Sequence, residues 1–356
     1  MTRVPAHDVV VAVHTAARPV DRAVASVVQH TDADVRVTVV CHGVAPEKIR
    51  GRLGALADHD RVRLIAHIDG IRSPAGPFNA GLAAATAPFV SVLGSDDRLE
   101  PHAVDSWLRV QRETGAAVVI PRLAFASGLR VRTPLSRPLR SRRLDPVRDR
   151  LSYRTAQLGL VSREAFPDLR FSEGVATGED VPFGLQLWFS GRGIALDRRG
   201  PAYFVHDDRD GDRTTLEQRS VADEFAFLSE VIGTSWFDAL PARSKRSIAT
   251  KLLRTHLVPS ALRRVRAGDA ERDVAALADV KTAILHAAPG AERPLSIRDA
   301  RLLDALAQDG AALRAVASGP EASVIAPSRL LTRRPSRLLD VESPVRLLGA
   351  ALFSSS

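Results

Sequence analysis

The first 120 residues alternate between short, largely apolar runs and longer segments in which apolar residues recur every three or four positions. Such runs, rich in β-branched residues, have the length of buried strands; they lie at 9–13, 35–40, 62–65, 89–93 and 116–120. The segments between them, such as 20–28 and 101–115, have the spacing of amphipathic helices. This alternation predicts an α/β fold with a doubly wound, mostly parallel sheet and right-handed crossovers.

A further apolar run at 203–205 predicts a last strand, and the strand pattern ends near residue 216. Four later segments carry apolar residues at helical spacing, which predicts four or five helices; they are 217–233, 241–267, 270–288 and 297–317. We therefore expect a catalytic α/β domain over residues 1–215, a helical domain over 216–327 and a basic amphipathic tail over 328–356. The tail repeats Arg-Leu-Leu three times. It either docks as a helix or frayed terminus, or binds an anionic lipid surface.

Composition narrows the class of protein. The chain has 356 residues, of which 45% are hydrophobic, enough for a large core. Its one cysteine, Cys41, excludes an internal disulfide and a multi-cysteine zinc site, and it suits a reducing cytoplasm. Neither a signal-peptide pattern nor an apolar run of about 18 residues occurs, so export by that route and membrane spanning are not expected. The formal net charge of +9 favours anionic partners.

The run at 89–93 leads directly into Gly94-Ser95-Asp96-Asp97. Ligands of open α/β sheets bind at the carboxyl ends of the strands, and the loop at 14–18 lies at that same edge. Adjacent carboxylates repel each other, and a divalent cation relieves that repulsion. The alternative is an ordinary polar turn that caps the next helix.

The order of these motifs resembles the family 2 glycosyltransferases of the GT-A fold. The resemblance is carried by the valine-rich first strand, the Asn79-Ala80-Gly81 helix and the strand that ends in Asp96-Asp97, over roughly residues 8–120 and again near 173–215. It implies a mostly parallel sheet flanked by helices, with a C-terminal helical appendage. The chain departs from the family at two places: Gly94 stands where the family usually has the first Asp of its motif, and Cys41-His42-Gly43 stands where the family usually has an Asp.

The resemblance implies a nucleotide-diphosphate sugar as the donor and Mg²⁺ or Mn²⁺ as the cofactor. The expected metal ligands are Asp96, Asp97 and His206. The alternatives for His206 are that it holds the diphosphate or that it is structural. Arginine matches phosphate oxygens bidentately, so Arg209 and Arg213 are expected to hold the diphosphate, unless they belong to a solvated charged loop. The expected donor-binding residues are Thr15, Arg18, His42, Asn79, Ser95, Asp96, Arg209 and Arg213.

The second stretch of resemblance contains Gly178-Glu179-Asp180. In the family the Asp at this place is the general base of an inverting transfer. An acceptor hydroxyl must lose its proton as it attacks the sugar, and a positioned carboxylate accelerates that step by about 10²–10⁴. We expect Asp180 to be the base, with Glu179 next in line. The alternative is that both acids only stabilise a helix N-terminus.

Residues 122–154 contain ten arginines but only two acids, and they also contain three prolines. This composition predicts a surface loop in the first domain. The loop is either a solvated insert or a contact surface for an anionic acceptor, such as a lipid-linked saccharide. Because no aromatic platform accompanies the arginines, nucleic acid is not expected as a partner.

Together these features predict an inverting glycosyltransferase that moves a sugar from a nucleotide-diphosphate donor to a cell-envelope or exopolysaccharide acceptor. The acceptor is expected to be a glycan or a lipid-linked saccharide. The alternative is a catalytically silent nucleotide-sugar-binding scaffold of a polysaccharide-assembly complex. Nucleotidyl transfer is disfavoured, because the loop after the first strand has no glycine. The expected location is the cytoplasm, with peripheral contact to the inner face of the plasma membrane, and homo-oligomerisation stays open.

Overall fold

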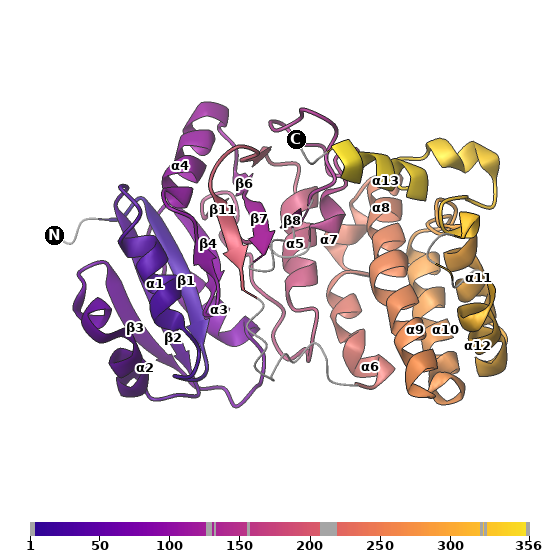
Figure 1. The fold of residues 1–356 in the computed structure, drawn as a ribbon, viewed down its shortest axis with the longest axis horizontal. Coiled ribbons are helices and arrows are strands. Elements are labelled where there is room, and N and C mark those ends of the chain that lie inside the picture. Colours follow the sequence, from indigo (N-terminus) through magenta and orange to yellow (C-terminus); the bar gives the residue numbers. More distant parts are fainter. Residues whose placement is uncertain are drawn as a thin grey trace. The chain divides into compact units, whose positions relative to one another are not determined.

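The computed structural model describes residues 4–125, 130–131, 133–154, 157–206, 219–320, 323 and 326–353. The chain divides into two compact units (Figure 1). The first comprises residues 1–133, 140–144 and 154–217, and the second comprises 134–139, 145–153 and 218–356. Two short segments of the arginine-rich stretch therefore belong to the helical unit, and so does the C-terminal tail.

A seven-stranded sheet forms the centre of the first unit, in the order β10-β6-β9-β4-β1-β2-β3. Neighbouring strands are parallel except that β9 runs antiparallel to both β4 and β6. The predicted strands are all present, as β1 (His7–Val13), β2 (Val35–His42), β3 (Val62–His67), β4 (Phe89–Gly94) and β6 (Val118–Ile120). The sequence did not predict β9 (Leu160–Ser162) or β10 (Ile194–Leu196).

Helices cover both faces of this sheet, because alternate side chains of a strand point to opposite faces. Val9, Val11 and Val13 of β1 belong to a buried cluster with apolar residues of the helices that cover one face. On the other face, a Cβ at Gly81 would collide with the Val10 side chain, so glycine is what allows α3 to lie close to β1. The helices of this unit are α1 (Val20–Val28), α2 (Pro46–Leu53), α3 (Ala75–Ala84), α4 (Ala103–Thr114) and α5 (Asp180–Phe189).

A second, smaller sheet has the order β5-β11-β7-β8. Its strands are β5 (Arg98–Leu99), β7 (Arg122–Phe125), β8 (Arg130–Val131) and β11 (Ala202–Val205). Only β11 was predicted, and β7 and β8 lie in the stretch expected to be a loop. This sheet brings the end of β11 to the segment that follows β4, because β11 pairs with β5.

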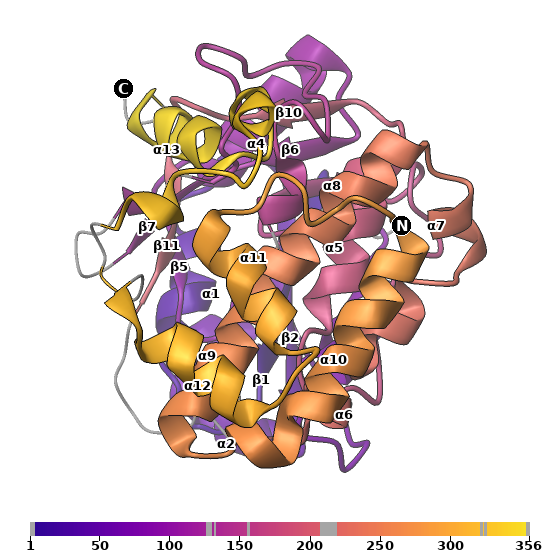
Figure 2. The ribbon, with the colours of Figure 1, turned by 90° about the vertical axis from the view of Figure 1, so that its right-hand side faces the viewer.

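The second unit is helical, as predicted (Figure 2). Its helices are α6 (Val221–Glu224), α7 (Ser235–Asp238), α8 (Ala242–Leu252), α9 (Val258–Ala267), α10 (Ala270–Ala287), α11 (Ile297–Ala305), α12 (Gly310–Ser318) and α13 (Pro344–Phe353), with a π-helical turn η5 (Leu253–Leu257) between α8 and α9. The single helix predicted over 297–317 is two helices, because Asp309 caps α12 by accepting from the Ala312 N–H at 2.7 Å. No helix among the described residues is long and apolar enough to cross a membrane.

Candidate functional site

The carboxyl ends of four neighbouring parallel strands, β4-β1-β2-β3, meet at one edge of the sheet. The register places Ala12 beside Gly94, Val13 beside Cys41, and His42 beside His67. The residues that follow these strands therefore line the same edge. This is the place where an open α/β sheet binds its ligands.

Arg18 and Asp96, two predicted donor-binding residues, meet at this edge. The Arg18 guanidinium donates to Oδ2 of Asp96 and forms an ion pair with it, and the side chains are 21% and 24% exposed. Arg22 donates to the backbone carbonyl of Asp96. The loop after β1 and the first turn of α1 thus supply positive charge to the loop after β4, within reach of solvent.

Asp97 has a different environment. Its Oδ2 accepts from the Tyr203 hydroxyl at 2.7 Å, and its Oδ1 accepts from the His206 N–H at 3.0 Å. Burial raises the pKa of Asp97 to about 6, although these two hydrogen bonds act in the opposite direction. Asp97 therefore ties the end of β4 to the end of β11, and both its oxygens are engaged in that task.

The contacts around Gly94 show why this position lacks the acid that the family usually has. A Cβ at this position would lie 2.5 Å from Oδ2 of Asp97, and the Gly94 N–H donates to the Tyr203 hydroxyl at 2.9 Å. A side chain at residue 94 is incompatible with this orientation of Asp97. The departure from the family motif is therefore coupled to the Asp97–Tyr203 contact.

The predicted metal ligands Asp96, Asp97 and His206 do not form a ready three-ligand group. Among the described residues, such a group occurs at Asp32, His102 and Asp105. There the Asp105 carboxylate accepts the N–H groups of Asp32 and Ala33, so it holds the chain that enters β2, away from the carboxyl edge.

Asp96 is the acid at the carboxyl edge that suits a cation. Mg²⁺ commonly uses one or two carboxylates and completes its shell with substrate phosphates and water. Asp96 is partly exposed, and its side chain pairs with Arg18. The residues present therefore fit a cation that is held by Asp96 together with a phosphorylated ligand, and they do not fit a cage built by the protein alone.

His42 lies in a cluster with His67 and Asp69 at the ends of β2 and β3. Nε2 of His42 is 2.7 Å from Oδ1 of Asp69, and Nε2 of His67 is 3.1 Å from Oδ2. Desolvation alone would raise the pKa of Asp69, but the hydrogen bonds from His42, the Ile71 N–H and His67 lower it overall. A Cβ at Gly76 would lie 2.8 Å from Nε2 of His67, so a glycine lets α3 begin beside the cluster.

Sequence reasoning missed His67 and Asp69. Their signal was present: both follow a predicted strand at the same edge as His42. A single polar residue after a short strand is common in any loop, so the pattern alone did not distinguish them.

Asn79 was predicted to bind the donor, but its side chain is 93% buried and engaged by protein groups. Its Nδ2 donates to the Phe171 carbonyl at 2.9 Å and to Glu173 Oε1 at 2.7 Å, and its Oδ1 accepts from the Phe171 N–H at 2.9 Å. Phe171 also stacks on Phe183 of α5, with ring centroids 4.1 Å apart. Asn79 thus holds the segment that leads to α5.

That segment ends at the two predicted catalytic acids. The Ser172 N–H donates to the Glu179 carbonyl at 3.1 Å, and α5 begins at Asp180. Gly178 has a φ of +79°, which turns the chain into the helix at a conformation that glycine adopts without strain. Glu179 and Asp180 are both partly exposed. Asp180 therefore sits on a positioned helix start with access to solvent.

The remaining predicted residues are less informative. Thr15 accepts from the Ala17 N–H at 3.3 Å within the loop after β1, and Ser95 is buried. His206 contributes its backbone N–H to Asp97. Arg209 and Arg213 lie outside the described residues.

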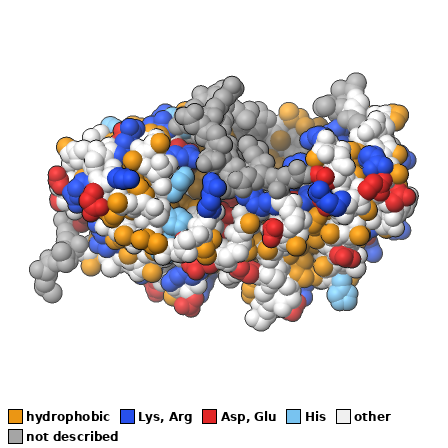
Figure 3. Space-filling model, turned by 90° about the horizontal axis from the view of Figure 1, so that it is seen from below, with side chains coloured by type: hydrophobic (Ala, Val, Ile, Leu, Met, Phe, Trp, Pro, Cys, Tyr) orange, Lys and Arg blue, Asp and Glu red, His pale blue; other side chains and the backbone are white. Residues whose placement is uncertain are grey.

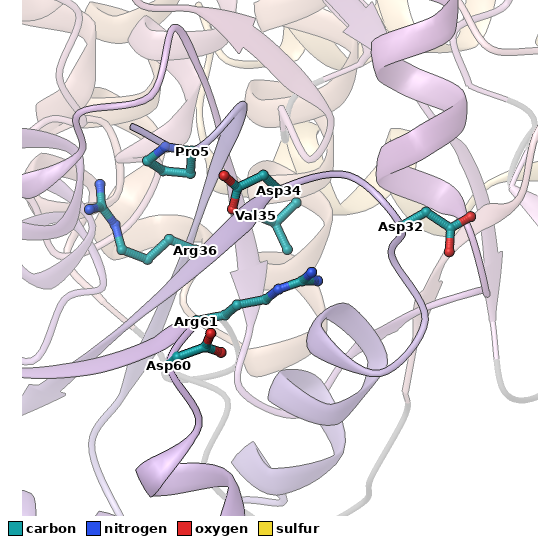
Figure 4. A pocket seen from close by; sticks show the side chains of 7 residues that line it. All are labelled: Pro5, Asp32, Asp34, Val35, Arg36, Asp60 and Arg61. Carbon is teal, nitrogen blue, oxygen red and sulfur yellow. The ribbon is translucent and has the colours of Figure 1, made fainter. Parts of the chain in front are cut away.

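A cavity of about 500 Å³ opens at the opposite edge of the sheet (Figure 4). It is lined by Pro5, Asp32, Asp34, Val35, Arg36, Asp60 and Arg61, which precede or begin β1, β2 and β3. Arg36 there pairs with Asp8, and Arg61 donates to the Thr31 carbonyl. Acidic and basic side chains are interspersed over the face drawn in Figure 3. Because open α/β sheets bind their ligands at the carboxyl ends of the strands, we assign the candidate site to the carboxyl edge and not to this cavity.

Comparison with known proteins gives a family match and a curated relative. Residues 8–170 match the family described as Glycosyl transferase family 2. Over 127 residues the chain is 33% identical to the succinoglycan biosynthesis protein ExoO of Rhizobium meliloti (strain 1021), covering 35% of each chain. The chain therefore spans about a third of the length of this relative.

Solved structures share the fold. The structure of S. aureus TarS 1–349 in complex with UDP-GlcNAc has a TM-score of 0.70 at 16% identity, covering 87% of this chain and 90% of that chain. The longer S. aureus TarS structure has a TM-score of 0.65 at 16% identity, covering 87% of this chain and 54% of that one. The predicted fold class is confirmed.

Proposed function

Residues 8–170 belong to glycosyl transferase family 2, which confirms the predicted resemblance over that stretch, and from this premise we propose that the chain is an inverting glycosyltransferase. It takes a nucleotide-diphosphate sugar and transfers the sugar to a cell-envelope or exopolysaccharide acceptor, either a glycan or a lipid-linked saccharide. The second stretch of resemblance, near 173–215, lies largely beyond the family match and stays a prediction.

The observation that carries this proposal is the meeting of Arg18 and Asp96 at the carboxyl edge, inside the family match. The donor diphosphate is placed beside this pair, because a guanidinium matches phosphate oxygens in both charge and geometry. His42, fixed by Asp69 at the end of β2, faces the same edge and is assigned to the nucleoside part of the donor. A UDP-sugar is the first donor to test, because the TarS structure was determined with UDP-GlcNAc.

Asp96 is the residue that would hold Mg²⁺ or Mn²⁺ with the donor phosphates. A bound cation would neutralise the charge that develops on the leaving diphosphate. Arg18, which pairs with Asp96, is close enough to help neutralise the same charge. Asp97 and His206 stay predicted ligands, and the hydrogen bond from the His206 N–H to Asp97 also holds the end of β4.

Asp180 is assigned as the general base. In an inverting transfer, the acceptor oxygen forms its bond to the anomeric carbon while the bond from that carbon to the phosphate oxygen breaks. The acceptor proton passes to the Asp180 carboxylate, which is partly exposed at the start of α5. Glu179 precedes it and is the second candidate. The exposed arginines at 140, 142 and 143 are assigned to an anionic acceptor.

A catalytically silent nucleotide-sugar-binding scaffold is the second candidate. It is favoured by Gly94, which removes one acid of the motif, and by the engagement of Asp97 with Tyr203. Such a protein would bind the donor at the same edge and transfer nothing.

The test is a thermal-shift screen of UDP-, GDP- and dTDP-sugars with and without Mn²⁺, followed by transfer assays on the donors that bind. A ligand at 100 times its dissociation constant adds about 2.7 kcal/mol of stability. Stabilisation with transfer supports the enzyme, and stabilisation without transfer to any acceptor in a broad panel supports the scaffold. A protein that binds no nucleotide sugar contradicts both candidates.

A further inference from the structure

The C-terminal helix α13 exposes an apolar stripe. Val345, Leu348 and Leu352 are 44%, 46% and 60% exposed. Their spacing of three and four residues puts them on one face of the helix. Ala350, by contrast, is buried. An amphipathic helix normally turns its apolar face to the core, so this stripe calls for an occupant.

The segment before α13 adds further exposed leucines. Leu330 and Leu331 are about two-fifths exposed, and Leu339 is 80% exposed. Within residues 326–353, single leucines and a leucine pair thus reach solvent at several points along the chain. The exposed residues within 326–353 are together called the C-terminal surface below.

Arginines accompany these apolar residues. Residues 326–353 contain five arginines and two acids, and one of those acids, Glu342, is buried. Arg333, Arg334 and Arg346 are exposed. Arg333 pairs with Asp304. The C-terminal surface is therefore both apolar and positively charged.

The surface is held in place by a buried polar network within the helical unit. Glu342 accepts from the Tyr153 hydroxyl at 2.6 Å and from Ser247 at 2.5 Å. Arg254 donates to the Glu342 carbonyl at 2.7 Å, and Arg150 donates to the Val341 carbonyl at 2.8 Å. These contacts come directly before α13. The tail is thus anchored, and its apolar stripe is presented in a fixed orientation.

We propose that the C-terminal surface docks the protein on an anionic lipid bilayer. Leu348, Leu352 and Val345 enter the interface between headgroups and acyl chains, while the arginines bind anionic headgroups. Exposed leucine and arginine in one anchored segment, with few acids, match such a surface in both apolar character and charge. This inference goes beyond the proposed function, because it concerns where the protein acts and needs no donor or acceptor.

The test measures flotation of the full chain with vesicles of phosphatidylcholine and phosphatidylglycerol at a ratio of 3:1, and with vesicles of phosphatidylcholine alone. We expect binding to the anionic vesicles only, weakened by added NaCl because exposed charges are screened. The combined substitutions Val345→Ser, Leu348→Ser and Leu352→Ser should lower the partition coefficient at least tenfold. Arg334→Gln with Arg346→Gln should lower it and flatten its salt dependence.

Val4→Ser provides the control, because Val4 is 62% exposed and belongs to the first unit. It should leave vesicle binding unchanged. Far-UV circular dichroism and the unfolding midpoint check that each variant folds. A wild-type chain that ignores anionic vesicles, or a triple variant that binds them as tightly, overturns the proposal. Self-association in analytical ultracentrifugation that the triple variant abolishes would identify a second copy as the occupant instead, and it would also overturn the proposal.

Discussion

The side-chain amide of Asn79 binds the backbone of Phe171 through both of its polar atoms. Nδ2 donates to the Phe171 carbonyl and Oδ1 accepts from the Phe171 N–H, each at 2.9 Å. Asn79 lies on α3, and Phe171 lies in the segment that leads to α5 and Asp180. One buried side chain therefore links α3, which begins at the carboxyl edge of the sheet, to the segment that leads to the proposed base.

Asn79→Asp should uncouple these elements. The aspartate keeps the acceptor for the Phe171 N–H but loses the donor to the Phe171 carbonyl, and it places a carboxylate beside Glu173. We expect a loss of about 1–3 kcal/mol in unfolding free energy, the cost of an unsatisfied buried polar group. Urea unfolding measures it, and kcat should fall more than donor affinity.

Glu173→Gln is the matched control for Asn79, because a glutamine oxygen can still accept from Nδ2 of Asn79. It should change stability by less than about 0.5 kcal/mol, as most exposed substitutions do. Equal losses in both variants would show that the Glu173 charge, and not the Phe171 backbone, is what Asn79 recognises.

Asp180→Asn should fall on the chemical step. Asparagine keeps the size of the side chain but cannot take the acceptor proton, so transfer should drop by about 10²-fold or more while donor affinity stays within a few-fold. Steady-state transfer and calorimetric donor binding measure the two effects. Glu179→Gln should retain most of the turnover. The reverse pattern would move the base to Glu179.

Asp96→Ala should abolish Mn²⁺-dependent nucleotide binding and leave the fold intact, because Asp96 is partly exposed. Titration calorimetry with UDP, with Mn²⁺ and with a chelator, measures the change. Wild-type affinity that is the same with the chelator would remove the cation from the mechanism.

His102→Asn separates Asp96 from the Asp32–His102–Asp105 group. It removes the imidazole from that group, and asparagine tolerates the left-handed φ of 62° at this residue. Mn²⁺-dependent nucleotide binding should persist in this variant. Its loss would assign the cation to the other cluster.

His7 should make folding sensitive to acid. The side chain is fully buried, with Nε2 2.9 Å from the Ser91 hydroxyl, and burial lowers the pKa of His7 to about 4. Between pH 6.5 and 4 the unfolded chain binds a proton that the folded protein does not. The stability that neutral His7 contributes is therefore complete above pH 6.5 and is lost as the pH falls toward 4, by up to about 3 kcal/mol.

Urea unfolding of the wild type and of His7→Gln between pH 4.5 and 7.5 measures this effect. The difference in stability between the two proteins should shrink as the pH falls. The His286→Gln variant should follow the wild-type curve, because the His286 side chain is exposed. A difference that is constant with pH would show that His7 titrates alike in the folded and unfolded protein.

The sequence by itself determined the main strands and the edge to which the candidate site is assigned. The run in β1 is apolar over five consecutive residues, and the run in β4 is apolar except at Ser91. Burial on both faces of a parallel sheet explains this pattern. Because parallel strands place their carboxyl ends together, the residues after them could be assigned to one site before any pairing was known.

Tertiary structure decided what these residues do there. β5, β7 and β10 have two to four residues, too few to carry a periodic signal. The sheet that contains β5, β7 and β11 joins Tyr203 to Asp97 across 106 positions of sequence, so Asp97 also ties two strand ends together. Asn79 likewise became a structural link only through its contact with Phe171, 92 residues away. Local sequence records which side chains are polar or apolar, but a hydrogen-bond partner distant in the chain depends on strand pairing and packing, which no local pattern encodes.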